Sequence, residues 1–209
     1  MMIIRTNHDT QTNYLYAYSN ELIEEAEKRF KVVKIEGKDI NEKVIRSRIK
    51  NRRPNFIFFN GHGSKTCLFD NDKKSFIDIN SSDIFKETVT FARACDCLDG
   101  LGKSAIENGC KSFIGYRKKF WIARHHEYEC TPLRDYVARP VIECSNIIVK
   151  ELIKSKTVDE AIKKSHEKSA DYILELVYSK EPLAIASLQA IIANDSTLDF
   201  EGGSSATIC

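Results

Sequence analysis

"FIFFNGHGS", residues 56–64, decides the fold, because four apolar residues run directly into a histidine framed by two glycines. An apolar run without polar alternation is typical of a parallel strand that is covered on both faces. In open parallel sheets, ligands and chemistry are found at the carboxyl ends of the strands. We therefore expect Phe56–Phe59 to form a central strand, with His62 at the functional edge of the sheet.

The rest of the chain alternates between short apolar segments and stretches with helical periodicity. Strands are predicted at residues 2–5, 31–35, 88–95 and 111–116, and a hairpin at 66–79. Helices are predicted at residues 14–30, 41–50, 101–108 and 182–193, and over 141–178 with a break near 155–157. This alternation predicts one α/β domain over residues 1–200, with helices on both faces of a mostly parallel sheet. Residues 201–209, EGGSSATIC, are expected to be a flexible tail.

The composition excludes several classes of partner. The net charge of +2 is too small to indicate a polyanionic partner, so we do not expect nucleic-acid binding. No apolar run approaches the roughly 18 residues of a membrane span, and the first ten residues hold too short an apolar core for a signal peptide. The seven cysteines include no pair of CxxC motifs. We expect a cytoplasmic protein without membrane association, whose thiols are mostly buried and reduced.

A second predicted strand ends in a thiol, Cys95, within TFARACDCLDG at residues 90–100. A thiol and an imidazole at the mouths of neighbouring strands form a nucleophile–base pair. A free thiol has a pKa near about 8.5, so an imidazolium beside it is needed to stabilise the thiolate and to protonate a leaving amine. Gly61 and Gly63 allow unusual backbone angles and close approach of a substrate carbonyl, and their N–H groups suit an oxyanion hole.

Together, the segments FFNGHGS, TFARACDCLDGLG and ENGCKSFIGY resemble the caspase–legumain–gingipain clan of cysteine peptidases. The similarity is greatest to its bacterial CHAT-type and gingipain-like branches. In that clan one strand ends in His-Gly, and the next ends in a small residue followed by the nucleophilic cysteine. His62 with Gly63 matches the first motif, and Ala94 with Cys95 matches the second. The resemblance covers residues 55–116 and, by pattern only, the first 50 residues.

This resemblance implies a three-layer α/β/α sandwich with a caspase-like, mostly parallel sheet and a catalytic Cys95–His62 dyad. It implies an oxyanion hole at the backbone of Gly63 and Cys95, and neither a metal nor an organic cofactor. The chain departs from the caspases in two ways. The motif Q-A-C-[RQG]-G is replaced by RACDC, and His62 and Cys95 are closer in sequence than the about 50 residues typical of caspases. Cys97, which follows closely, is an alternative nucleophile.

Three further side chains are candidates for substrate binding. Asp96 and Asp99 either shape a pocket for a basic substrate side chain, orient His62, or only solvate their loop. Residues 117–139 form a long irregular segment of the kind that is usually functional, so we expect a lid or specificity wall with Trp121 against the substrate. Adjacent histidines on a loop rarely converge on one ion, so no metal site is predicted there. The residues concerned are His125, His126, Glu127, Glu129 and Cys130.

The sequence therefore predicts a cysteine endopeptidase that cleaves extended polypeptides through a thioester intermediate. Control by a regulatory partner or by dimerisation is expected from the family. The alternatives are a catalytically inactive caspase-like scaffold and an α/β module that binds a ligand or a partner protein. Nucleotide binding is not favoured, because GLGKS at residues 100–104 lacks the first glycine of a P-loop at the required spacing.

Overall fold

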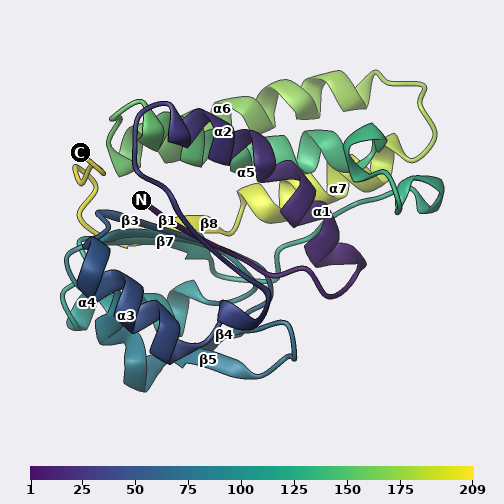
Figure 1. The fold of residues 1–209 in the computed structure, drawn as a ribbon. Helices are drawn as coiled ribbons and strands as arrows, with labels where there is room; N and C mark the ends of the chain where they lie inside the picture. The colour runs from purple at the N-terminus through teal and green to yellow at the C-terminus, as the bar shows by residue number, and fades with distance from the viewer.

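The computed structural model describes residues 1–209 and is built around a six-stranded sheet in the order β2-β1-β3-β6-β7-β8 (Figure 1). The first five strands in this order pair in parallel, and β8 pairs with β7 in the antiparallel sense. The central strand predicted at Phe56–Phe59 is confirmed, because β3 has a parallel neighbour on each side. The strands are β1 (Met2–Arg5), β2 (Val33–Glu36), β3 (Phe56–Asn60), β6 (Val89–Arg93), β7 (Ser112–Tyr116) and β8 (Leu198–Gly202).

Helices cover both faces of this sheet, so the three-layer α/β/α sandwich is confirmed (Figure 1). One face carries α3 (Glu42–Arg52), α4 (Lys103–Glu107) and the predicted hairpin, which consists of β4 (Cys67–Phe69) and β5 (Ser75–Asp78). The other face carries α1 (Thr10–Tyr18), α2 (Asn20–Glu27), α5 (Ala138–Ile153), α6 (Val158–Val177) and α7 (Ala184–Asp195). Short helical turns lie at Gly37–Asp39, Ile79–Phe85, Leu98–Gly102, His126–Tyr128 and Pro132–Arg134.

Alternation along the central strands divides the core between the two layers. Ile57 and Phe59 of β3 pack into the cluster beneath α3 and the hairpin. Phe56 and Phe58 pack into the cluster beneath α2, α5 and α6. Because successive side chains of a strand point to opposite faces, a fully apolar strand is what a sheet covered on both sides requires. None of the helices combines the length and apolar composition needed to cross a membrane.

The helix predicted at residues 14–30 is instead two helices, α1 and α2, which are separated at Ser19. The buried guanidinium of Arg5 donates hydrogen bonds to Tyr16 O (3.3 Å), Ser19 Oγ (3.0 Å) and Asn20 Oδ1 (2.7 Å). These bonds occupy the polar groups at the junction between the helices. The hydrophobic periodicity continues through the break, so the sequence pattern alone did not reveal it.

Residues 201–209 also differ from the flexible tail that we expected. Glu201 and Gly202 belong to β8, which closes one edge of the sheet beside β7. Beyond the strand, Val158 N donates to Ala206 O (3.0 Å) and Asp159 N donates to Ser204 O (3.0 Å). Ile208 is buried in the core cluster beneath α5 and α6. The segment therefore completes the sheet and the core instead of extending from them.

Candidate active site

The two strand ends singled out in the sequence lie side by side. In the parallel pair β3–β6, Asn60 is level with Arg93, and each strand ends at that residue. Gly61 N donates to Arg93 O (3.3 Å), which continues the pairing one step beyond the strands. His62 and Cys95 each follow two residues after these paired strand ends. Both are therefore delivered to the same edge of the sheet, at the same level.

A buried polar contact fixes this register. Arg93 Nε donates to Asn60 Oδ1 (2.8 Å), and Nη1 donates to Ser145 Oγ (2.8 Å) and Asn146 Oδ1 (2.6 Å) of α5. Asn60 Nδ2 donates to Leu15 O of α1 (2.7 Å). Both Asn60 and Arg93 are fully buried, and burial lowers the pKa of Arg93 to about 10. Because an unpartnered buried polar group is costly, these bonds hold the ends of β3 and β6 together.

The glycines around His62 provide room for close packing and do not adopt unusual backbone angles, since neither has a positive φ. A methyl group on Gly61 would lie 2.3 Å from Thr6 Oγ1. A methyl group on Gly63 would lie 2.9 Å from Ala94 Cβ. The backbone next to the histidine is thus packed directly against the residue that precedes Cys95, which is why small residues are needed on both strand ends.

His62 is held by Asp9, which lies beyond the carboxyl end of β1. His62 Nε2 is 2.7 Å from Asp9 Oδ2. Asp9 is also the N-cap of α1, where it accepts a hydrogen bond from Thr12 N (2.9 Å). Partial burial raises the pKa of Asp9, but the hydrogen bonds from Thr12 and His62 outweigh it and lower the pKa to about 2. Asp9 is therefore ionised at neutral pH, and since it holds Nε2, the Nδ1 atom of His62 is left for a thiol.

Cys95 is partly buried and faces the segment that follows β7. Phe120 N lies 3.4 Å from Cys95 Sγ, and Phe120 O lies 4.0 Å from it. Burial raises the pKa of the Cys95 thiol, and the contact with the Phe120 backbone offsets this only in part. A cavity of about 360 Å³ is lined by Asp9, His62, Gly63, Phe69 and Lys73, and Cys95 is not among its lining residues. The thiol therefore does not line the cavity onto which the imidazole of His62 opens.

Cys97, the alternative nucleophile, is fully buried. Its Sγ lies 3.7 Å from both Ala92 O and Ala94 O, and burial raises its pKa to about 12. A thiolate cannot form readily in such surroundings. Of the two thiols, Cys95 is the more accessible.

Four backbone donors at the two strand ends have no acceptor in the protein. Gly63 N and Cys95 N donate no hydrogen bond, and neither do His62 N and Ala94 N, whereas Ser64 N and Asp96 N do. Ser64 N donates to Cys67 O (2.8 Å), and Phe69 N donates to His62 O (3.0 Å), which joins the hairpin to the histidine backbone. Buried or half-buried N–H groups are usually paired. Gly63 N and Cys95 N, the pair that the family resemblance implies for an oxyanion hole, are among these unpaired donors.

The three candidate substrate-binding residues lie in different surroundings. The carboxylate of Asp99 is engaged by Arg117, and Arg117 also binds Asp199 of β8 (2.8 Å), so Asp99 offers no free charge to a substrate. Asp96 adopts a positive φ of 56°, and its N–H donates to Lys118 O (3.0 Å). Trp121 is 54 % exposed and lies next in sequence to Phe120.

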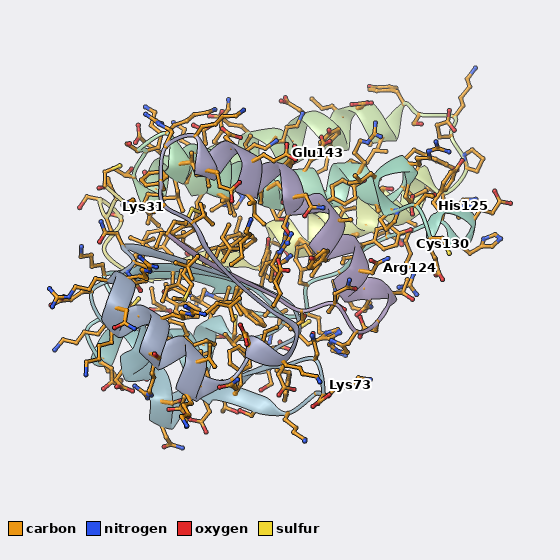
Figure 2. All side chains as sticks on the ribbon, viewed as in Figure 1. Lys31, Lys73, Arg124, His125, Cys130 and Glu143 are labelled. Atoms are coloured by element: carbon orange, nitrogen blue, oxygen red, sulfur yellow. The ribbon has the colours of Figure 1, made fainter.

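The irregular segment after β7 lies at the end of the molecule toward which the parallel strands run. Figure 2 shows Arg124, His125 and Cys130 at that end, on the same side as Lys73 of the hairpin. The buried carboxylate of Asp135 fixes the segment, because it accepts hydrogen bonds from Tyr14 Oη (2.6 Å) and His125 N (2.9 Å). The side chains of His125 and His126 stack on each other, with ring centroids 4.9 Å apart.

Sequence reasoning missed one residue of the site, Asp9. Asp9 and Thr12 form a capping box at the start of α1, and DTQT at residues 9–12 is a recognisable signal for it. Because β1 lies beside β3, a helix that begins directly after β1 places its cap next to His62. Read in this way, the capping signal could have identified Asp9 as the partner of the imidazole.

A scan against models of known protein families finds no match for this chain, and a search of curated protein sequences finds none either. Functional conclusions therefore rest on the geometry of the site. That geometry offers an oriented imidazole, a thiol on the neighbouring strand end, and free backbone donors. Such a set is suited to nucleophilic attack on a carbonyl group.

Proposed function

We propose that this protein is a cysteine endopeptidase in which Cys95 is the nucleophile and His62 the general base and acid. Asp9 orients the imidazole, and the N–H groups of Gly63 and Cys95 bind the oxyanion. The observation that carries the proposal is the register of β3 and β6, in which Asn60 pairs with Arg93. His62 and Cys95 each follow two residues after this pair. The free N–H groups and the ionised Asp9 add independent support.

The chemistry follows from these roles. Cys95 passes its proton to Nδ1 of His62, and Sγ attacks the scissile carbonyl to form a C–S bond. The carbonyl oxygen becomes an oxyanion and accepts hydrogen bonds from Gly63 N and Cys95 N. As the C–N bond breaks, His62 returns the proton to the leaving amine, and a thioester remains. A water molecule, deprotonated by His62, hydrolyses the thioester and regenerates the thiol.

Access to the thiol requires a local movement. Cys95 Sγ lies against the backbone of Phe120, so the thiol must turn away from this contact before it reaches His62. The contact belongs to the irregular segment 117–137, for which we propose the role of a specificity wall. Substrate binding beside Trp121 would then shift the wall and release the thiol at the same time.

The proposed substrate contact is apolar. A cavity of about 450 Å³ begins at Trp121 and runs along one side of α7, and six of its seven lining residues are hydrophobic. The backbone of Trp121 is anchored there, because its main-chain N–H donates to Asn194 Oδ1 (2.8 Å) and its main-chain carbonyl accepts from Asn194 Nδ2 (2.8 Å). We propose that this groove takes an apolar side chain of an extended polypeptide.

The seven cysteines form no disulfide, which fits the reducing conditions of the cytoplasm that we propose as the protein's location. Free thiols in such a compartment keep a nucleophilic cysteine available without an activating reductant. A shielded Cys95 also suits control by a regulatory partner or by a second copy of the chain.

The test is digestion of a peptide library by the unmodified protein and by Cys95→Ala. We expect cleavage only by the former, with a loss of at least about 10⁴-fold in rate for the variant, as for other catalytic nucleophiles. Cys130→Ala is the matched control, because Cys130 is an exposed thiol on the irregular segment and should leave cleavage unchanged. Equal cleavage by all three proteins would trace the activity to a contaminant and contradict the proposal.

The second candidate is a catalytically inactive caspase-like scaffold. One observation favours it: burial raises the pKa of Cys95, and the thiol faces Phe120 instead of the cavity at His62. A peptide aldehyde that forms a reversible thiohemiacetal separates the two candidates. An active site that opens on binding would give an adduct at Cys95, which is detected by NMR with a ¹³C-labelled aldehyde carbon, whereas an inactive scaffold would give none.

A further inference from the structure

A second imidazole, that of His8, lies beside the Asp9 carboxylate that holds His62. His8 precedes Asp9, and its imidazole is 10 % exposed. Its Nε2 lies 3.5 Å from Asp9 Oδ2, yet neither ring nitrogen has a hydrogen-bond partner and both are buried. Buried polar atoms without partners are rare in folded proteins, so each one needs a physical explanation. The dyad chemistry makes no use of His8.

His8 and His62 approach Asp9 from two sides. Their rings meet edge to face, with centroids 5.4 Å apart. One ligating atom from each of His8, Asp9 and His62 lies within 4.8 Å of the other two. His62 is 30 % exposed and lines the cavity at the end of β3, so solvent reaches one side of the group. The three side chains therefore converge on one point that is open to small solutes.

We propose that His8, Asp9 and His62 form a binding site for a divalent transition-metal ion of the Zn²⁺ class. Two imidazoles and one carboxylate are a donor set that such ions prefer over Mg²⁺ or Ca²⁺. Ligand distances of about 2.0–2.2 Å in a tetrahedral site place donor atoms roughly 3.3 Å apart. The 3.5 Å contact between His8 and Asp9 is close to this spacing, and the 2.7 Å contact between His62 and Asp9 needs to open to roughly 3.3 Å. Three protein ligands leave the fourth position to water.

Metal binding at this site is incompatible with the proposed chemistry. Nε2 of His62 must give its lone pair to the ion, so the proton it shares with Asp9 moves to Nδ1. The Nδ1 atom then holds a proton and cannot accept the one from Cys95. The inferred role is reversible inhibition of the peptidase by a zinc-class ion. The inhibitory consequence rests on the proposed function, whereas the metal site itself does not.

Cobalt(II) provides the direct measurement, because four-coordinate Co²⁺ has intense visible absorption bands. We expect the unmodified chain to bind one equivalent of Co²⁺ with such bands, and Zn²⁺ to displace it. His8→Leu removes one ligand and keeps a side chain of similar size in its place, and it should weaken binding by more than about 100-fold, beyond the effect typical of an outer-shell change. His126→Ala removes an exposed loop histidine and should bind as the unmodified chain does.

The same variants separate this inference from the proposed function. Cleavage of the library-derived peptide by His8→Leu should be as fast as by the unmodified chain, and Zn²⁺ should no longer inhibit it. Should His8→Leu fail to fold, His62→Ala serves for the Co²⁺ measurement alone, with loss of the bands expected. Absence of the bands in the unmodified chain, or equal binding by the His8 or His62 variant, overturns the metal site whether or not peptides are cleaved. A protein that binds Co²⁺ as described and cleaves nothing retains the site and loses the peptidase.

Discussion

His62 and His166 both hydrogen-bond an aspartate, at 2.7 Å and 2.9 Å, yet the two pairs lie in very different surroundings. His62 with Asp9 stands at the carboxyl ends of the central strands, beside a cavity, a neighbouring thiol strand and unpaired N–H groups. The hydrogen bond between His166 and Asp195 joins α6 to α7, two helices that cover the same face of the sheet. An imidazole–carboxylate pair is therefore not a site by itself. The adjoining strand ends make the difference.

The largest expected difference between the two pairs is in catalysis. His62→Ala should lower kcat/KM for a cleaved peptide by about 10⁴-fold or more, since it removes both the base and the acid. His166→Ala should leave kcat/KM within about twofold, because distant surface changes rarely affect a site. Steady-state kinetics of the two variants on one peptide measure this. Similar losses in both would show that His62 acts only through the fold.

The carboxylates provide the next test. Asp9→Asn should lower kcat by about 10²- to 10³-fold, because an amide neither holds the correct imidazole tautomer nor stabilises the imidazolium. Asparagine is as good an N-cap as aspartate, so α1 and the thermal unfolding temperature should change little. Asp195→Asn is the matched control and should keep full activity. A large drop in unfolding temperature for Asp9→Asn would instead assign Asp9 a structural role.

A change in packing beside the His62–Asp9 pair should reduce activity less than loss of either side chain, by an amount that can still be measured. The methyl group of Gly63→Ala would meet Ala94 Cβ at 2.9 Å, and such overpacking typically costs about 1–3 kcal/mol of stability. The strand ends would also be pushed apart, so we expect a loss of activity of about tenfold. The double variant Gly63→Ala with Ala94→Gly restores the space and should recover most of both losses. Urea unfolding measures the loss of stability, and peptide kinetics measure the loss of activity. A double variant that is as unstable and as slow as Gly63→Ala would exclude the contact between residues 63 and 94 as the cause.

The smallest effect concerns the second pair and the dependence of stability on pH. The hydrogen bond that His166 donates to Asp195 raises the pKa of His166 in the folded chain. This contribution is fully present below the unfolded pKa of about 6.5 and is lost as the pH rises through the folded value. Because the ring is 41 % exposed, it should amount to less than about 1 kcal/mol. Urea unfolding between pH 5.5 and 8.5 should show this loss in the unmodified chain and not in His166→Ala; an equal slope in both would assign it elsewhere.

The features that sequence reasoning anticipated are local ones. An apolar run that ends in His62, and a β-rich run that ends at Cys95, each identify a strand end within a few residues. Parallel pairing then places both at one edge of the sheet, which is why the dyad candidates could be recognised before the structure was known. The choice between Cys95 and Cys97 could not be made in this way, because it depends on burial by β7 and Phe120.

The features that were missed depend on long-range contacts. Asp9 and His8 reach His62 only because β1 pairs with β3, and no periodicity in the sequence shows this. The break at Ser19 is accompanied by a hydrogen bond from Arg5, which lies on β1 and is distant in the sequence. Strand β8 has alternating Leu198 and Phe200, but the glycines and serines after it suggested a flexible end. In each case a distant partner outweighs the local signal.

The hairpin β4–β5 has a consequence for control of the site. Its first strand is bonded to the main chain of His62 through Phe69 N, and Lys73 at its tip lines the cavity that the imidazole faces. A molecule that binds the β4–β5 hairpin would shift His62 directly, without entering the cavity. A partner bound at this hairpin could therefore control the position of His62 without any rearrangement of the hydrophobic core.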